Sequence, residues 1–319
     1  MNRLPLCRAR DLGTDTPPPR RWLVESLWAE RAVGILGGEP KCGKSLLALD
    51  LAVAVAAGTP CLRRFDVAER GRVLLYAAED SLAVVRERLE GIVAAAGTRL
   101  GALDLFVITA PTLRLDTATD QDRLEETVRS ARPRLLVLDP FVRLHAIDEN
   151  LAGDVAPLLG YLRRLERLYA CAVLLVHHVR KGAASLRPGQ ALRGSSELHA
   201  WGDSNLYLRR RADTLRLSVE HRAAAGFDDL FLRLPEPGHP LALAIVDDPP
   251  AAEPADTPST TVTAHQRVYA ALAAAAAPLA LAELRQACRI RTSTLCSILN
   301  TLTAEGTIRK TSAGYAAVR

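Results

Sequence analysis

The sequence lacks three features, and each absence excludes a class of protein. No apolar run of about eighteen residues is free of charge and proline, so no membrane-spanning helix and no membrane partner are expected. The amino-terminal arginines are followed by no apolar core, which argues against a secretory signal. The six cysteines include no Cys-x-x-Cys pair, which argues against a disulfide framework and a zinc site. These absences predict a protein of the reducing cytoplasm.

The remaining composition is that of a globular chain with a small excess of basic residues. Its 319 residues are 49% hydrophobic and 24% charged, which suits one large domain or a large and a small one. The formal net charge of +5 permits a polyanionic partner but does not require one.

The most informative stretch is a complete phosphate-binding pattern: Gly38, then Glu39, Pro40, Lys41 and Cys42, then Gly43, Lys44 and Ser45. The apolar runs 32–36 and 46–56 supply the strand and the helix that this pattern requires. Glycines let the N–H groups of the loop turn inward around phosphate oxygens, and the helix N-terminus adds positive potential. Lys44 is expected to reach the β- and γ-phosphates of ATP, and the Ser45 hydroxyl to hold Mg²⁺. The alternative is a chance match in a glycine-rich turn.

Strand-like and helix-like segments alternate through most of the chain. Apolar runs at 71–76, 105–108, 134–139 and 171–178 are separated by helical patterns at 81–95, 120–131 and 156–169. This alternation predicts an α/β fold with a mostly parallel central sheet that is buried on both faces. The runs 206–209 and 215–220 are expected as antiparallel additions at one side, and 231–234 with 241–246 as another pair.

Composition divides the chain into four parts. Residues 1–20 are rich in Arg and Pro and are expected to form a flexible arm, followed by the ATPase domain at 21–246. Residues 247–261 are rich in Pro, Ala and Asp and are expected to form a linker. Residues 262–319 show three helical patterns and then a short β-wing, which predicts a winged helix-turn-helix.

Two carboxylates are expected beside the phosphate loop, at the carboxyl edge of the sheet. Asp139 ends an apolar strand and is the candidate ligand of Mg²⁺, directly or through water; the alternative is an aspartate that caps a turn. Glu79 follows the strand at 71–76 and is the candidate base for the attacking water. Asp80 competes for that role and is otherwise expected to be the N-cap of the next helix.

His177 and His178 end another strand, so one is expected to face the nucleotide and the other the interior. The histidine that faces the nucleotide would sense the γ-phosphate; a hydrogen-bonded core histidine is the alternative. The following loop carries Lys181, Arg187 and Arg193 among glycines, without an acid or an aromatic residue. It is expected to bind the backbone of single-stranded DNA, and a plain solvated loop is the alternative.

An arginine near the end of the α/β domain is a candidate finger for the γ-phosphate of a neighbouring subunit. Arg222 follows the strand at 215–220 and is the first choice. Arg209, Arg210 and Arg211 are its rivals.

Four segments resemble the RepA-type plasmid replicative helicases, which belong to the RecA/DnaB-like ATPases. They are Leu-Asp-Pro-Phe-Val-Arg-Leu-His at 138–145, Asp-Glu-Asn at 148–150, His-His-Val-Arg-Lys-Gly-Ala at 177–183 and Leu-Arg-Gly-Ser-Ser at 192–196. The resemblance covers roughly residues 20–225. It implies a RecA-like core, a homohexameric ring and ATP hydrolysis at subunit interfaces, coupled to single-stranded DNA.

The resemblance also implies roles for individual residues. Lys44 and Ser45 would hold the triphosphate and Mg²⁺, Glu79 would be the base, Asp139 the metal-side carboxylate and His178 the γ-phosphate sensor. Residues 262–319 lie outside this match and resemble the winged helices of DNA-binding regulators.

Three functions fit these patterns. The first is a DNA-dependent ATPase motor, specifically a ring-forming replicative helicase of a plasmid or mobile element. The second is an ATP-switched regulator or loader whose winged helix binds duplex DNA through Arg289, Arg291, Arg309 and Lys310. The third is a recombination-type ATPase that forms filaments, since rings and filaments use the same head-to-tail interfaces.

Overall fold

A computed structural model describes residues 6–11, 21–178 and 196–246 except 212, 225, 227, 228 and 237, and residues 264–317 with several short gaps. The chain divides into two compact units, Met1–Asp247 and Asp248–Arg319. Most of the expected arm and all of the expected linker lie outside the described residues.

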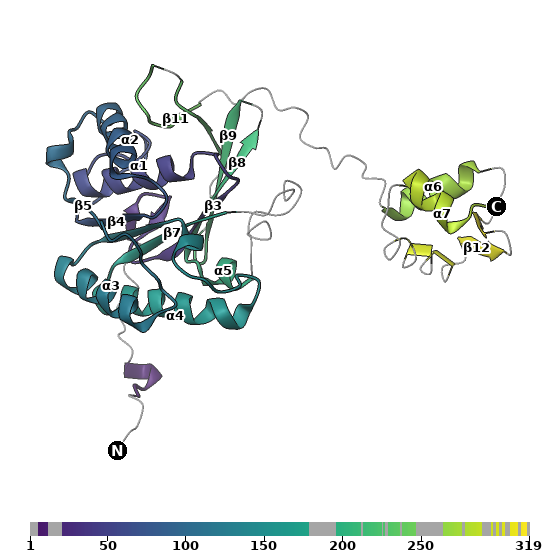
Figure 1. Cartoon of the computed structure of the whole chain (residues 1–319), viewed down its shortest axis with the longest axis horizontal. Coiled ribbons are helices and arrows are strands. Elements are labelled where there is room, and N and C mark those ends of the chain that lie inside the picture. The colour runs from purple at the N-terminus through teal and green to yellow at the C-terminus, as the bar shows by residue number, and fades with distance from the viewer. Residues whose placement is uncertain are drawn as a thin grey trace. The chain divides into compact units, whose positions relative to one another are not determined.

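The first unit is built on a nine-stranded sheet with the order β11-β10-β9-β8-β3-β7-β6-β4-β5 (Figure 1). Its strands are β3 (Val33–Gly38), β4 (Val73–Ala77), β5 (Leu105–Val107), β6 (Leu135–Asp139), β7 (Ala172–His178), β8 (Ser204–Arg211), β9 (Thr214–His221), β10 (Leu230–Arg233) and β11 (Ala244–Ile245). The six strands from β8 to β5 are parallel, which confirms the predicted mostly parallel sheet. A two-stranded ribbon, β1 (Trp22–Val24) with β2 (Trp28–Ala29), precedes the sheet.

The prediction for the late strands was partly wrong. β9, β10 and β11 are antiparallel additions, as expected, but β8 pairs parallel to β3. The helix α5 (Ser196–Trp201) lies between β7 and β8, so the chain crosses over before β8 and re-enters the sheet in the same direction. Sequence periodicity reports the burial of a strand but not the direction of its neighbour.

Helices cover both faces of the sheet (Figure 1). One apolar cluster joins the sheet to α1 (Lys44–Ala57) and α2 (Leu82–Ala95). The other joins it to α3 (Ala118–Ala131), α4 (Ala152–Tyr169) and α5. Along β7, Leu174 belongs to the first cluster, whereas Val173 and Leu175 belong to the second. This alternation explains why a strand buried on both faces is apolar at successive positions.

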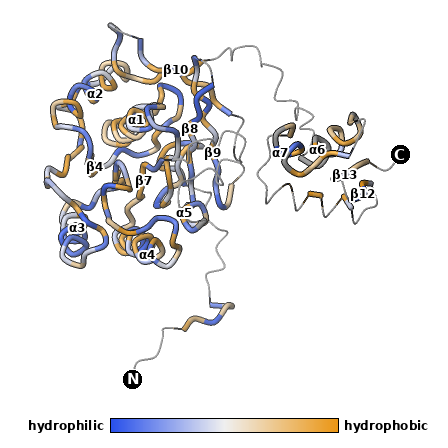
Figure 2. Tube along the Cα trace, turned by 45° about the vertical axis from the view of Figure 1, so that its right-hand side comes forward, coloured by the Kyte–Doolittle hydropathy of each residue, from blue (hydrophilic) through white to orange (hydrophobic). Residues whose placement is uncertain are grey.

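The helix α1 is apolar on nearly all sides (Figure 2). All ten residues from Leu47 to Ala56 are buried, as expected for a helix that lies in the interior of the domain. A helix of this kind fixes the position of its own N-terminus, where the phosphate loop ends. No helix in the described parts of the chain is both long and apolar enough to cross a membrane.

The second unit contains the helices α6 (Ala264–Ala274) and α7 (Leu281–Cys288) and the antiparallel hairpin of β12 (Ile308–Thr311) and β13 (Gly314–Ala317). An apolar cluster including Val268, Leu284, Leu299 and Ile308 forms its core. The hairpin lies at the predicted wing, whereas much of the expected helix at 292–305 lies outside the described residues. The winged helix-turn-helix therefore stays a prediction.

We expect Leu174→Ala to lower the free energy of unfolding by about 2–5 kcal/mol, because it leaves a cavity beneath α1. Leu168→Ala, a matched change on α4 at a side chain that is 58% exposed, should stay within about 0.5 kcal/mol of the wild type. Urea unfolding followed by circular dichroism measures both. Equal losses in the two variants would contradict the assigned position of β7 in the core.

Candidate nucleotide-binding site

Strand register gathers the predicted residues at one edge of the sheet. Gly38 at the end of β3 pairs with His178 at the end of β7, and Ala77 of β4 pairs with Asp139 of β6. Because all four strands are parallel, their carboxyl ends meet there. A cavity of about 320 Å³ opens at this edge. It is lined by Lys41, Gly43, Lys44, Ser45, Leu46, Glu79, Asp80, Arg88, Asp139, Pro140, His178 and Leu234.

The two glycines of the phosphate loop are required by its shape. Gly43 has a φ of +85°, in the left-handed region that favours glycine, directly before α1 begins at Lys44. A Cβ added to Gly38 would lie 2.7 Å from the carbonyl oxygen of Leu208 and 2.8 Å from Cys42 Sγ. Neither position accepts a side chain without displacing the loop. The N-terminus of α1 is thus kept beside the cavity, where it can bind an anion.

The residues between the two glycines hold the loop in place. The carbonyl oxygen of Glu39 accepts a hydrogen bond of 2.6 Å from Lys44 Nζ, and the carbonyl of Lys41 accepts one of 3.1 Å from Arg210. Cys42 is buried, and this burial raises the pKa of its thiol, so it packs as a small neutral side chain. Pro40 lies between Glu39 and Lys41, in the turn after β3.

Lys44 is the buried cation of the site. Its residue is only 5% exposed, and burial lowers the pKa of its ammonium group. The nearby Asp139, Glu39 and Glu79 act in the opposite direction and favour the charged form. An ammonium group with little water around it gains more from a phosphate than an exposed one would, since the local dielectric is low.

Asp139 and Ser45 form a pair that suits Mg²⁺. Burial raises the pKa of Asp139 to about 6, against the opposing effect of a hydrogen bond that Ser45 donates to it. A carboxylate and a hydroxyl are hard oxygen ligands, and Mg²⁺ is usually bound by one or two such groups together with phosphate oxygens. No cluster of three or more His, Cys, Asp and Glu ligands occurs in the part of the chain that the structure describes. The donor set therefore fits an ion bound jointly with a triphosphate.

The two acidic residues after β4 have different partners. Glu79 lines the cavity, and its Oε1 accepts a hydrogen bond of 2.7 Å from Arg143 Nε. The alternative role for Asp80, as N-cap of α2, was wrong: Ser81 is the N-cap, and its Oγ accepts a 3.4 Å hydrogen bond from the N–H of Val84. Asp80 instead faces the cavity and forms an ion pair with Arg88 of α2.

The two histidines at the end of β7 face opposite sides, as their alternation predicts. His178 lines the cavity. His177 is 1% exposed, and its ring centroid lies 6.0 Å from that of Phe141 in the interior. The geometry therefore leaves His178 as the residue that a γ-phosphate would meet.

The remaining cations divide between the two edges of the sheet. Arg222 follows β9 at the amino edge, where its guanidinium donates to the carbonyls of Ala200 and Trp201 and lies 3.5 Å from Asp203. Arg209, Arg210 and Arg211 end β8 at the edge of the phosphate loop, since Leu208 pairs with Gly38. The predicted DNA-binding residues Lys181, Arg187 and Arg193 lie outside the described residues.

Sequence reasoning missed the contacts of three arginines: it assigned no role to Arg88 or Arg143, and it considered Arg210 only as a candidate finger. Arg143 and Arg210 are far in sequence from the groups that they contact. Arg88 lies on the face of α2 that lines the cavity, where it contacts Asp80. Arg143 stood within one of the quoted family-like segments, which was a signal for its importance but not for its partner.

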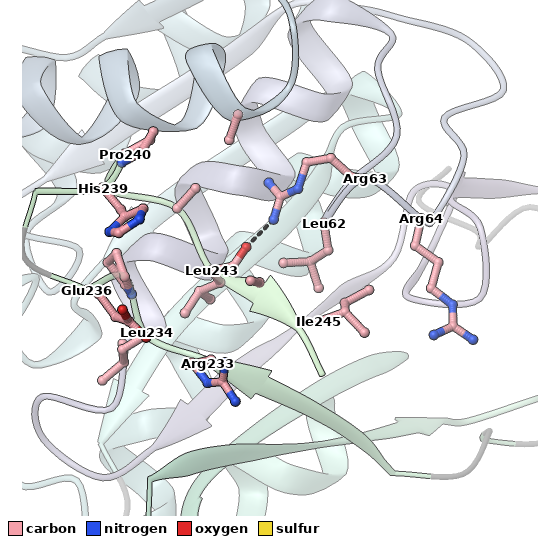
Figure 3. Close-up of a pocket in the computed structure, with 14 residues that line it drawn as sticks. Leu62, Arg63, Arg64, Arg233, Leu234, Glu236, His239, Pro240, Leu243 and Ile245 are labelled. Carbon is pink, nitrogen blue, oxygen red and sulfur yellow. Dashed lines mark hydrogen bonds between the residues drawn. The ribbon is translucent and has the colours of Figure 1, made fainter. Parts of the chain in front are cut away.

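A larger cavity of about 710 Å³ is lined mainly by residues 62–64 and by residues of β10, β11 and the segment between them (Figure 3). Leu234 lines both cavities, and a Cβ on Gly43 would lie 2.9 Å from its Cδ2 and 3.4 Å from Cδ2 of Leu243. Arg63 faces this cavity but is bound to Asp50 of α1 at 2.7 Å and to the carbonyl of Leu243 (Figure 3). This region supports the loop and does not contain the predicted phosphate ligands.

Comparisons with known proteins agree with this architecture. Residues 2–184 match the model of the AAA domain family. The structure of a DnaB-like replicative helicase is similar with a TM-score of 0.53 and 13% identity, over 67% of this chain and 57% of that one. The RadB recombinase is similar with a TM-score of 0.50 and 15% identity, over 68% of this chain and 92% of that one. The likeness establishes the RecA-like fold, and the chain spans 57% of the length of the DnaB-like helicase.

The raised pKa of Asp139 makes a prediction about stability and pH. Because the folded protein binds a proton there that the unfolded chain releases near pH 4, this group lowers stability as the pH rises from about 4 to about 6. Asp139→Asn in the nucleotide-free protein should therefore gain about 2–3 kcal/mol relative to the wild type on going from pH 4 to pH 7.5. Thermal unfolding at both pH values measures the difference.

Asp122→Asn removes an exposed carboxylate from α3 and serves as the control for loss of charge. It should show no comparable gain. If Asp139→Asn and the wild type respond to pH in parallel, Asp139 is not desolvated in the way that its burial indicates.

Proposed function

The chain belongs to the AAA domain family, and we propose that it is a Mg²⁺-dependent ATPase motor. Single-stranded DNA would stimulate its ATP hydrolysis, and the motor would move along that DNA. More narrowly, we propose a ring-forming replicative helicase of the RepA type, from a plasmid or other mobile element. One observation carries the ATPase part: Lys44, Ser45, Glu79, Asp139 and His178 line one cavity at the carboxyl edge of the sheet.

The residues around this cavity have complementary roles in ATP hydrolysis. The loop N–H groups and Lys44 bind the phosphates, and Ser45 with Asp139 would hold Mg²⁺, which neutralises phosphate charge when bound. Glu79 accepts a proton as a water oxygen bonds to the γ-phosphorus. The bond from that phosphorus to the bridging oxygen breaks, leaving ADP and inorganic phosphate. His178 contacts the γ-phosphate and reports its loss to the segment after β7.

Charge at the transition state favours an oligomer. Phosphoryl transfer usually requires a further cation near the γ-phosphate. Among the described residues, the lysines and arginines that line the cavity are Lys41, Lys44 and Arg88, and Arg88 is paired with Asp80. A neighbour's arginine is the proposed donor, either Arg222 or one of Arg209, Arg210 and Arg211, in a head-to-tail hexamer.

The proposal of a DNA substrate is supported by similarity and by sequence. The solved structures with this fold include a DnaB-like replicative helicase and a recombinase. The loop with Lys181, Arg187 and Arg193 follows directly after the strand that carries His178. The test is the ATPase rate with and without single-stranded DNA, together with ATP-dependent strand separation. Equal rates and no strand separation would refute the motor.

A second candidate function is an ATP-switched regulator or loader that binds duplex DNA. It is favoured by the separate second unit, whose β12 carries the exposed residues Arg309 and Lys310. Footprinting of the whole chain on duplex DNA, with and without ATP, distinguishes the two. A protected sequence-specific site without unwinding supports the regulator.

We expect Lys44→Ala and Glu79→Gln to impair hydrolysis strongly, for different reasons. Lys44→Ala removes a phosphate contact and should weaken nucleotide binding. Glu79→Gln removes the base and should lower kcat on the order of 100-fold or more while nucleotide affinity changes little. A fluorescent ATP analogue measures the affinity, and phosphate release measures the rate.

Glu87→Gln is the matched control, because it makes the same change at an exposed position of α2. It should leave both affinity and rate near the wild-type values. Normal turnover in Glu79→Gln would contradict the role of Glu79, and Asp80→Gln would then be the next variant to measure.

A further inference from the structure

Glu79 makes an ion pair that the hydrolytic chemistry does not require. Arg143 Nε donates to Glu79 Oε1 at 2.7 Å, although the two residues are 64 positions apart. The side chains are 62% and 44% exposed, respectively, so water and ions reach both. Exposed ion pairs contribute little to stability and exchange readily. The effect of this pair therefore concerns the position of the carboxylate and not the stability of the fold.

The backbone that carries Arg143 is firmly held, in contrast to its side chain. Arg143 ends the short helix η3 (Phe141–Arg143), which follows β6 and Asp139. Phe141 and Leu144 on either side of it are fully buried. The N–H of Leu115 donates to the carbonyl of Leu144 at 2.6 Å, and the N–H of Ala146 donates to Asp116 at 3.0 Å. Arg143 is thus presented to solvent from a fixed point beside the cavity.

The carboxylate is also attached to a fixed point. The N–H of Ala78, next to Glu79, donates to the carbonyl of Asp139 at 2.7 Å. This hydrogen bond joins the segment after β4 to the segment after β6, close to the pair of Glu79 and Arg143. While they are paired, the hydrogen bond from Arg143 restrains the orientation of the Glu79 carboxylate.

We propose that Arg143 is a positioning residue that restrains Glu79 and releases it when a polyanion binds. A phosphate of single-stranded DNA competes with the carboxylate for the guanidinium, because arginine forms charge-assisted hydrogen bonds with the oxygens of either group. Release allows Glu79 to orient and deprotonate water. This inference rests on the proposed function, since it takes Glu79 as the base and DNA as the polyanion.

The size of the effect follows from the usual strength of such a pair. The strength of an exposed ion pair corresponds to a ratio of paired to released Glu79 of roughly 1.4 to 5. Without the pair all Glu79 is released, so the released fraction should rise by about two- to sixfold. We therefore expect Arg143→Ala to increase the DNA-independent kcat by about two- to sixfold, with an unchanged KM for ATP. Stimulation by DNA should fall by the same factor.

The experiment measures steady-state ATP hydrolysis by the full chain with Mg²⁺, with and without a poly(dT) oligonucleotide. Arg143→Lys keeps a positive charge and should lie between the wild type and Arg143→Ala. Arg129→Ala is the matched control: this arginine of α3 pairs with Glu126 at 2.6 Å, and the two side chains are 61% and 62% exposed. It should leave the rate and the stimulation unchanged.

The possible results separate this inference from the function on which it rests. A DNA-independent rate that is unchanged in Arg143→Ala, even with stimulation lost, overturns the restraint and leaves Arg143 as a plain DNA contact. A lower rate also overturns it, because Arg143 would then assist Glu79. If the wild type hydrolyses no ATP, the proposed function fails as well. If Glu79→Gln is fully active, this inference fails with the role of Glu79, while the proposed ATPase activity stands.

Discussion

Parallel pairing of β3 with β7 is the constraint on which the rest of this structure depends. It places Gly38 opposite His178, and the pairing of β4 with β6 places Ala77 opposite Asp139. β6 ends in Asp139 and β7 in His178, while β3 and β4 lead directly into the phosphate loop and into Glu79. Before these ends the four strands are apolar and buried. Because parallel strands all point the same way, ordinary burial of apolar side chains is enough to bring distant polar residues together.

Burial also determines the electrostatics of the carboxyl edge of the sheet. Lys44 and Asp139 both lie in a region with little water, and in each case burial disfavours the charged form. A triphosphate with a divalent cation supplies opposite charges to both groups, so ligand binding offsets part of the cost of desolvation. The same groups that destabilise the empty site would thus favour the filled one.

Arginines connect this edge to its surroundings. Arg210 binds the phosphate loop, Arg88 binds Asp80 and Arg143 binds Glu79. These contacts are partly exposed, and such contacts rearrange more easily than the core beneath them. In the proposed mechanism, this division between a rigid core and exchangeable ion pairs is what couples the nucleotide to a second ligand.

The sequence by itself determined the fold class, the phosphate loop and most of the strands, because hydrophobic periodicity and glycine spacing are local properties. It also identified Glu79, Asp139 and His178 as strand-end residues. Only the tertiary structure decided that β8 runs parallel to β3, that Ser81 and not Asp80 caps α2, and that Arg143 contacts Glu79. These depend on chain direction, on competition between neighbouring side chains and on contacts across 64 residues. Local patterns carry no information about such choices, since the packing of the whole domain sets them.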